Sequence, residues 1–153
     1  MLDGSELLNR NRRRPKVDPM SLWRFSTSYT LYGRHLDLDE LFSRARPRCA
    51  YEEWRKGEPG PLGPSNTSGL RIEVMKGRSD AVLFRSVLRF LEREERFLKA
   101  AARFSGPKIW SVLTTALYVR ETGPVTLSLP KSLLTLASRS GVGWSITGYP
   151  CSD

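Results

Sequence analysis

The feature that most constrains how this chain can fold is an alternation of side chains that begins at residue 23. Every second position holds an aromatic, β-branched or aliphatic residue, in the order Trp23, Phe25, Thr27, Tyr29 and Leu31. Arginine, serine and threonine fill the positions between them. A period of two that is rich in aromatic residues is typical of a β-strand with one face buried. The sequence therefore predicts a half-buried strand that Gly33 ends.

Three segments have the features of amphipathic helices. Residues 81–104 give the clearest signal, because leucine, valine and phenylalanine recur there near helical spacing and arginine and glutamate fill the rest. Residues 37–47 predict a short helix that Pro47 ends, with acidic residues early and arginines late. Residues 128–140 predict a third helix with a leucine-rich buried face.

Side chains that can cap these helices precede each of them. Asp37 can cap the first helix, and either Ser79 or Asp80 can cap the long one. Ser128 is expected to cap the third, with Pro130 tolerated in its first turn.

Further strands are expected between the helices. Residues 48–54 and 70–75 predict short strands, and residues 142–149 predict a last one. Residues 108–119 are apolar and β-branched on both faces, which is typical of a central strand. The segment 56–69 between two of these strands contains so much glycine and proline that we expect no regular element in it.

This order of elements predicts an α+β fold with a mainly antiparallel sheet of about five strands and two or three helices packed on one face. The recurrence of strand, helix and strand is compatible with a ferredoxin-like or related split arrangement. We expect a single domain over residues 20–153 and a separate, disordered basic arm over residues 1–19.

The charge of the chain favours acidic partners. There are 25 Lys and Arg residues against 16 Asp and Glu, a formal net charge of +9, and such a surface attracts nucleic acid, anionic lipid or an acidic protein. Two regions concentrate the positive charge, and a nucleic acid would contact them at Arg12, Arg13, Arg14 and Lys16 of the arm and at Arg89 and Arg93 of the long helix. The alternative for the helix is a solvated face with Glu–Arg pairs.

The sequence carries no recognisable catalytic constellation. His35 is the only histidine, and no nucleophile motif surrounds a serine or cysteine. The glycine-rich loop leads into a strand and not a helix, which argues against a phosphate-binding loop. Clustered ligands for a metal are absent from the sequence pattern. We therefore expect no enzymatic activity, no cofactor and no metal. The short RNA-binding signature is also absent, and strand aromatics such as Trp110 are expected in the core.

The remaining features predict a soluble, cytoplasmic protein without a membrane contact. The N-terminal residues lack the apolar region of a signal peptide, and no apolar run approaches the ~20 residues of a membrane span. Cys49 and Cys151 could form one disulfide, although free thiols in a reducing compartment are the simpler interpretation.

Four stretches resemble the bacterial family of unknown function called DUF4279. They are "FSTSYTLYG", "LDLDELFSRARP", "YEEWRKGEP" and the closing "GPVTLSLPKSLLTLASRSGVGWSITGY". The resemblance spans about residues 22–149. It implies a small bacterial cytoplasmic α+β protein with no established enzymatic activity. Small bacterial families of this kind often accompany toxins as immunity proteins, so the resemblance implies a toxin–antitoxin role.

Two functions from different classes follow. The first is a protein-binding module, most specifically an immunity-type protein that occludes a cognate toxin. Its partner would contact the segment at the end of a predicted edge strand, Trp54, Arg55, Lys56 and Glu58, because tryptophan and arginine anchor many interfaces. That segment also has a structural interpretation, in which Gly57 permits a turn and Trp54 packs over the core. The second is nucleic-acid binding through the arm and the arginine-rich helix.

Overall fold

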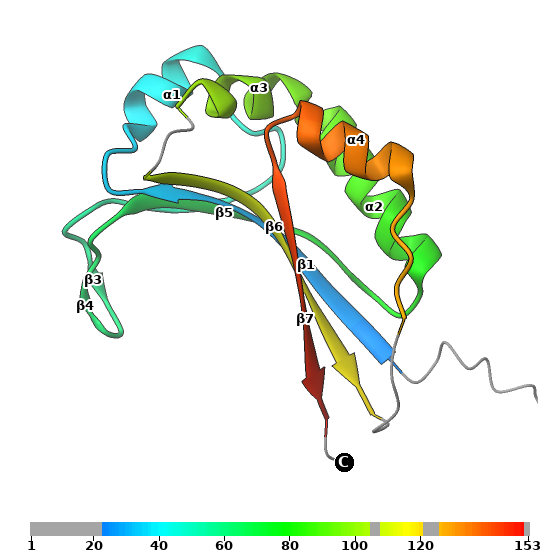
Figure 1. Ribbon diagram of the computed structural model, residues 1–153. Helices are drawn as coiled ribbons and strands as arrows, with labels where there is room; N and C mark the ends of the chain where they lie inside the picture. The colour runs from blue at the N-terminus through cyan, green and yellow to red at the C-terminus, as the bar shows by residue number, and fades with distance from the viewer. Residues whose placement is uncertain (1–22, 105–107, 121–125, 152–153) are drawn as a thin grey trace, which may run out of the picture.

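The computed structural model describes residues 23–104, 108–120 and 126–151. Figure 1 shows the helices on one side of an arching sheet. The expected α+β class is confirmed, with four helices in place of two or three. The strands are β1 (Trp23–Gly33), β2 (Glu52–Trp54), β3 (Pro59–Gly60), β4 (Gly63–Pro64), β5 (Ser68–Gly77), β6 (Ile109–Val119) and β7 (Gly143–Pro150). The helices are α1 (Leu38–Arg44), α2 (Asp80–Arg93), α3 (Glu95–Phe104) and α4 (Lys131–Arg139).

The main sheet has five strands in the order β2-β5-β1-β6-β7. The first four pair antiparallel, and β7 pairs parallel to β6 after the crossover through α4. The order of the first four strands, with helices between β1 and β2 and between β5 and β6, is the split β-α-β arrangement of the ferredoxin-like type. The strand β7 extends that arrangement by one position.

The alternation along β1 decides which face of the sheet is buried. Phe25, Thr27, Tyr29 and Leu31 are all buried, as the sequence predicts. Their register partners on the neighbouring strands, such as Leu113 opposite Tyr29, lie on the same face. The core therefore fills the space between this face and the helices.

The polar groups of three buried side chains in this core are satisfied by bonds between strands. Thr27 Oγ1 and Thr115 Oγ1 are 2.9 Å apart and buried, and the indole Nε1 of Trp144 donates to Thr115 Oγ1 at 3.0 Å. The hydroxyl of Tyr29 lies 2.8 Å from Ser111 Oγ. These bonds connect β1, β6 and β7, so the register of the central strands is fixed by polar as well as apolar contacts.

The long helix predicted over residues 81–104 is two helices that meet at Glu94, and here the single-helix prediction is wrong. The side chain of Glu94 is buried, with 1% of the residue exposed. Its Oε2 accepts the backbone N–H of Arg48 at 2.8 Å, and its Oε1 accepts that of Cys49 at 3.0 Å. The break allows a charged residue of the helix pair to point inward and bind the connection between α1 and β2. Helical spacing alone gave no sign of this contact.

The capping predictions are confirmed for two helices and wrong for one. Asp37 accepts the N–H of Glu40 at 2.9 Å, and Ser79 accepts that of Val82 at 3.2 Å. Ser128, however, lies too far upstream, because α4 begins at Lys131 with Pro130 at its N-cap and no side-chain capping bond. Pro130 has an extended backbone, with φ −60° and ψ 132°, so it precedes the helix and does not lie in its first turn as expected.

The glycine- and proline-rich loop contains a small hairpin, which corrects the expectation that it has no regular element. Strands β3 and β4 pair Pro59 with Pro64 and Gly60 with Gly63. Two backbone bonds close the base of the hairpin: the N–H of Gly57 donates to the carbonyl of Ser65 at 2.7 Å, and the N–H of Ser65 to that of Glu58 at 2.9 Å. Prolines are compatible with so short a ladder because both strands are edges. Figure 1 shows the hairpin extending away from the helices.

The basic arm predicted at residues 1–19 falls outside the described residues.

The buried carboxylate of Glu94 gives a first test. Glu94→Ala leaves the partly buried N–H groups of Arg48 and Cys49 without this acceptor, so we expect the free energy of unfolding to fall by about 2–5 kcal/mol. Glu94→Gln keeps one acceptor oxygen and should lose less. Urea unfolding followed by circular dichroism measures both. Glu92→Ala, on the exposed face of α2, is the matched control, and an equal loss there would contradict the role given to Glu94.

The pH dependence of stability gives a second test. Burial raises the pKa of Tyr29 well above its ordinary value, against a smaller lowering effect of its bond to Ser111. A raised pKa in the folded state means that the unfolded chain loses this proton first. The contribution is fully present below about pH 10 and is lost as the pH rises further.

At neutral pH, Tyr29→Phe should be less stable than the wild type by about 1 kcal/mol, because it lacks the hydrogen bond to Ser111. Between about pH 9 and about pH 11, the free energy of unfolding of Tyr29→Phe should fall less than that of the wild type. Urea midpoints across that range measure the slope. Tyr149→Phe, which removes an exposed hydroxyl, leaves Tyr29 in place and should keep the wild-type slope. Parallel slopes for wild type and Tyr29→Phe would contradict the assignment.

Candidate binding surface

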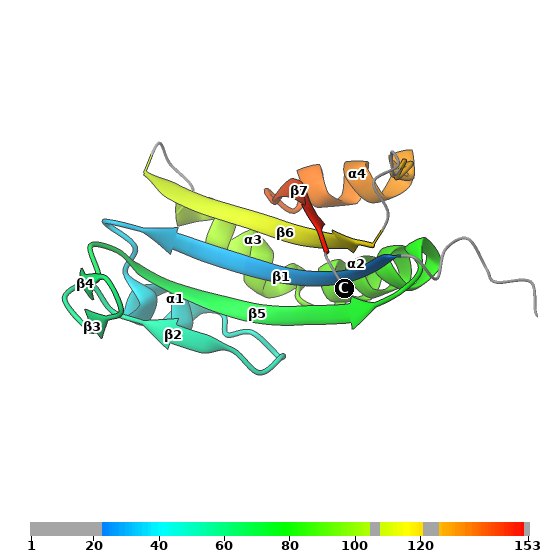
Figure 2. The same ribbon diagram turned by 90° about the horizontal axis from the view of Figure 1, so that it is seen from below.

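The face of the main sheet that points away from the helices is the candidate site, and we call it the open face. Its β1 side chains are Arg24, Ser26, Ser28, Thr30 and Tyr32, which alternate with the core residues. Figure 2 looks onto this face, with strands in front and helices behind. Directly paired residues share a face, so the open face of the neighbouring strands can be read from the register.

Three aromatic side chains cross one end of the open face, and we call Trp54, Tyr32 and Trp110 the aromatic row. Tyr32 is paired with Trp110 across β1 and β6, and their rings stack with centroids 5.3 Å apart and an interplanar angle of 19°. Trp54 on β2 is paired with Gly69 on β5, which in turn is paired with Tyr32. A methyl at Gly69 would lie 2.3 Å from Cζ2 of Trp54. The indole therefore lies directly over the glycine, so the row spans four strands.

A second cluster lies at the opposite end of β1, and we call Arg24, Tyr118 and Tyr149 the tyrosine row. Tyr118 and Tyr149 are register partners on β6 and β7, with ring centroids 5.7 Å apart and an interplanar angle of 23°. The guanidinium carbon of Arg24 lies 5.3 Å from the centroid of the Tyr118 ring. This arrangement combines stacked rings with a cation on one of them.

A hollow of about 610 Å³ lies beside the tyrosine row. Of the described residues that line it, four are cationic and one is acidic: Arg24, Arg71, Lys76, Arg78 and Glu73. Lys76 Nζ lies 3.1 Å from Glu73 Oε1. Four positive charges against one negative charge leave the hollow with a net charge of +3. Anionic groups are therefore attracted to this part of the open face.

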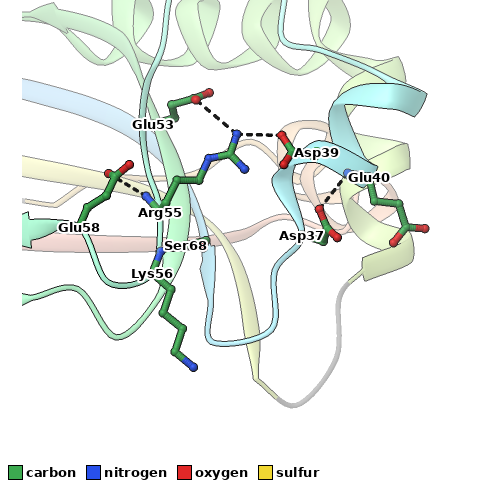
Figure 3. A network of polar contacts seen from close by, with 8 residues as sticks. All are labelled: Asp37, Asp39, Glu40, Glu53, Arg55, Lys56, Glu58 and Ser68. Atoms are coloured by element: carbon green, nitrogen blue, oxygen red, sulfur yellow. Dashed lines mark hydrogen bonds and ion pairs between the residues drawn. The ribbon is translucent and has the colours of Figure 1, made fainter.

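Two charged residues of the predicted partner-binding segment, Arg55 and Glu58, make contacts within the protein. Arg55 donates to Asp39 Oδ1 at 3.0 Å and lies 3.5 Å from Glu53 Oε1, and Figure 3 shows the guanidinium between the two carboxylates. The bond to Asp39 raises the pKa of Arg55 above its ordinary value. The backbone N–H of Arg55 also donates to Glu58 Oε2 at 2.9 Å. Arg55 and Glu58 therefore hold the turn after β2 and connect it to α1.

Lys56 and Trp54 complete that segment. The backbone N–H of Lys56 donates to Ser68 Oγ at 3.0 Å, and its side chain is exposed (Figure 3). The positive φ of Gly57, 91°, permits the turn that follows, as the sequence predicts. Trp54 does not pack over the core as expected: it lies on the open face and its Nε1 donates to Thr67 Oγ1 at 3.3 Å. The structure thus brings the four predicted residues together. Of these four, only Trp54 belongs to the aromatic row.

The residues predicted to bind nucleic acid fall into two groups, of which only one lies within the described residues. Arg12, Arg13, Arg14 and Lys16 lie outside the described residues. Arg89 and Arg93 line one hollow of about 570 Å³ beside β5.

Arg93 already has partners in that hollow. It donates to Cys49 Sγ, and its Nε lies 3.5 Å from Glu94 Oε1. Burial, assisted by the Glu94 carboxylate, raises the pKa of the Cys49 thiol. Cys49 and Cys151 are both free cysteines, so no disulfide joins them. Of the two helix arginines predicted to bind nucleic acid, Arg93 is therefore already engaged in contacts within the protein.

Sequence reasoning missed the open-face role of the aromatic residues. Trp110 is expected in the core, but the residue is 50% exposed. Both the odd- and the even-numbered positions of residues 109–119 hold apolar side chains, so the pattern did not reveal which set faces the helices. The alternation of β1 together with the strand register identifies the set, because Tyr32 belongs to the polar set of β1 and pairs with Trp110.

The described residues offer neither a metal site nor a membrane-spanning helix. Within residues 23–104, 108–120 and 126–151, no three His, Cys, Asp or Glu side chains come together in a way that could hold a metal ion. In the same ranges, no helix is long and apolar enough to cross a membrane.

Comparison with known proteins finds no match: no protein-family model matches the chain, nor does any curated protein or solved structure. The resemblance to DUF4279 stays a prediction from the sequence.

The contact between Gly69 and Trp54 gives a third test. In Gly69→Ala the new methyl would meet Trp54 Cζ2 at 2.3 Å and the Leu31 carbonyl oxygen at 2.6 Å. We expect the indole to be displaced and the free energy of unfolding to fall by about 1–3 kcal/mol. Tryptophan fluorescence and urea unfolding measure the two effects. Gly148→Ala is the matched control, because no atom lies within 4 Å of its Cβ position; unchanged fluorescence in Gly69→Ala would contradict the described packing.

Proposed function

We propose that this protein is a non-catalytic binding module that holds single-stranded nucleic acid across the open face of its sheet. The observation that supports the proposal is the pair of aromatic rows at the two ends of one sheet face, with cations between them. The proposal keeps the nucleic-acid class suggested by the net charge and moves the contact from the helix to the sheet.

The aromatic rows supply stacking surfaces. Trp110 is 50% exposed and Tyr149 is 48% exposed, and each is already stacked on a partner that holds its ring in place. Every base has a π-face, so stacking on an aromatic ring binds single strands with little dependence on sequence. The bases of a single strand are free to stack in this way, whereas those of a duplex are paired and enclosed.

The polar surface between the rows suits a phosphate backbone. Arg24 and Tyr32 are eight residues apart on β1, which at about 3.3 Å per residue separates the rows by roughly 26 Å. The β1 side chains on this path are small: Ser26, Ser28 and Thr30. The hollow with Arg71, Lys76 and Arg78 lies along the same face. A chain of several nucleotides could therefore stack at both ends and place phosphates beside the cations.

The test measures anisotropy of fluorescently labelled single-stranded DNA and RNA, with a duplex of the same sequence for comparison. We expect Trp110→Ala and Tyr149→Ala each to weaken binding by about 1–3 kcal/mol. Leu88→Ala and Leu134→Ala are matched controls, because these leucines are comparably exposed on helices. They should bind as the wild type does.

A salt titration separates the sheet from the helix. Arg71→Ala and Arg78→Ala should each reduce the slope of log affinity against log salt by about 1, whereas Arg85→Ala and Arg89→Ala on α2 should leave it unchanged. Equal effects of the two pairs, or tighter binding of duplex than of single strands, would overturn the assignment to the open face.

A protein partner, most specifically a toxin occluded in an immunity-type complex, is the second candidate. One observation favours it: β2 is the edge strand of the main sheet and carries Trp54, which an added strand or loop could contact. Affinity capture from the native host, with and without nuclease, separates the candidates. A single stoichiometric protein that survives nuclease would favour this candidate, and loss of all captured material would favour nucleic acid.

A further inference from the structure

A cavity on the helix side of the sheet is lined by an unusual number of arginines. Its volume is about 270 Å³, and it lies between the segment after α1 and the junction of α2 and α3. We call its five basic residues the arginine pocket: Arg44, Arg46, Arg48, Arg93 and Arg96. They come from two segments that are far apart in the sequence and that the Glu94 carboxylate joins.

Aromatic and acidic neighbours hold two of these guanidinium groups. Arg44 donates to Glu40 Oε1 at 2.6 Å, and its guanidinium lies 5.3 Å from the centroid of Phe104. The guanidinium of Arg46 lies 5.1 Å from the centroid of Phe42. Such contacts orient the planar groups before any ligand arrives, which lowers the entropy lost on binding.

The single carboxylate among the described lining residues does not neutralise the pocket. Both oxygens of Glu94 accept backbone N–H groups, and Oε1 also lies 3.5 Å from Arg93 Nε. The five arginines and Glu94 give the lining of the pocket a net charge of +4. The ion pair between Arg44 and Glu40 reduces this net charge to +3. Like charges held this close repel one another, so a bound anion would relieve the repulsion.

We propose that the arginine pocket binds a phosphate dianion, either as free phosphate or as the phosphate group of a small molecule or phosphopeptide. Arginine presents a planar fork of donors that matches phosphate oxygens, and several forks around one cavity suit a group with two charges and multiple acceptors. The pocket lies beside the helices and away from the open face, so this proposal does not depend on the proposed nucleic-acid function.

The test measures thermal stability and calorimetric binding with inorganic phosphate at constant ionic strength, with sodium acetate as the comparison anion. We expect the melting temperature of the wild type to rise with phosphate and not with acetate. In Arg48→Ala/Arg96→Ala the affinity for phosphate should fall at least about tenfold. The control Arg85→Ala/Arg103→Ala removes the same charge from arginines that do not line this cavity and should keep wild-type affinity.

A conservative variant guards against misfolding. Arg48→Lys/Arg96→Lys keeps the charge but loses the forked geometry, so its affinity should be intermediate while its circular dichroism spectrum matches the wild type. Phosphoserine peptide and nucleoside monophosphate, added in separate titrations, identify the source of the phosphate by which of them binds more tightly than inorganic phosphate. Equal stabilisation by acetate, or equal losses in the pocket and control variants, would overturn the proposal.

Discussion

The central strand β1 is hydrogen-bonded to β5 on one side and to β6 on the other, and its side chains alternate between a buried and a polar set. This alternation constrains every other element. The helices must cover the face of Phe25 and Tyr29, because burial of these rings supplies much of the stabilising free energy. The opposite face then contains hydroxyl groups, cations and the stacked rings of Tyr32 and Trp110. The same alternation therefore produces both the core and the candidate binding surface.

Glu94 has a comparable role on the helix side. A buried carboxylate needs hydrogen bonds, and the N–H groups of Arg48 and Cys49 supply them. This contact lies where α2 and α3 meet, and it holds the backbone of Arg48 beside that junction, where Arg93 and Arg96 line the same cavity. The bond of this one buried charge therefore helps to assemble the arginine pocket. Among the described residues, two clusters of positive charge lie on opposite sides of the sheet: the hollow beside the tyrosine row and the arginine pocket.

Much of the fold could be predicted from the sequence, because its signals are local. The period of two in β1, the cap at Asp37 and the apolar run of β6 each depend on residues within a few positions of one another. The candidate site was predicted less completely. Trp54 was identified, but the other members of the aromatic row, Tyr32 and Trp110, come from other strands and lie at the same end of the open face only because of the register. No local pattern contains that register.

By itself the sequence determined the class of fold, the buried side of β1, two of the three expected caps and the positive charge available for anionic partners. Tertiary structure decided where that charge and the aromatic rings gather. The physical reason is that strand pairing and the buried Glu94 carboxylate act between residues distant in the chain, so the energy of each contact depends on the whole arrangement. Periodicity reports which residues avoid water, and only packing determines which of the remaining side chains lie together.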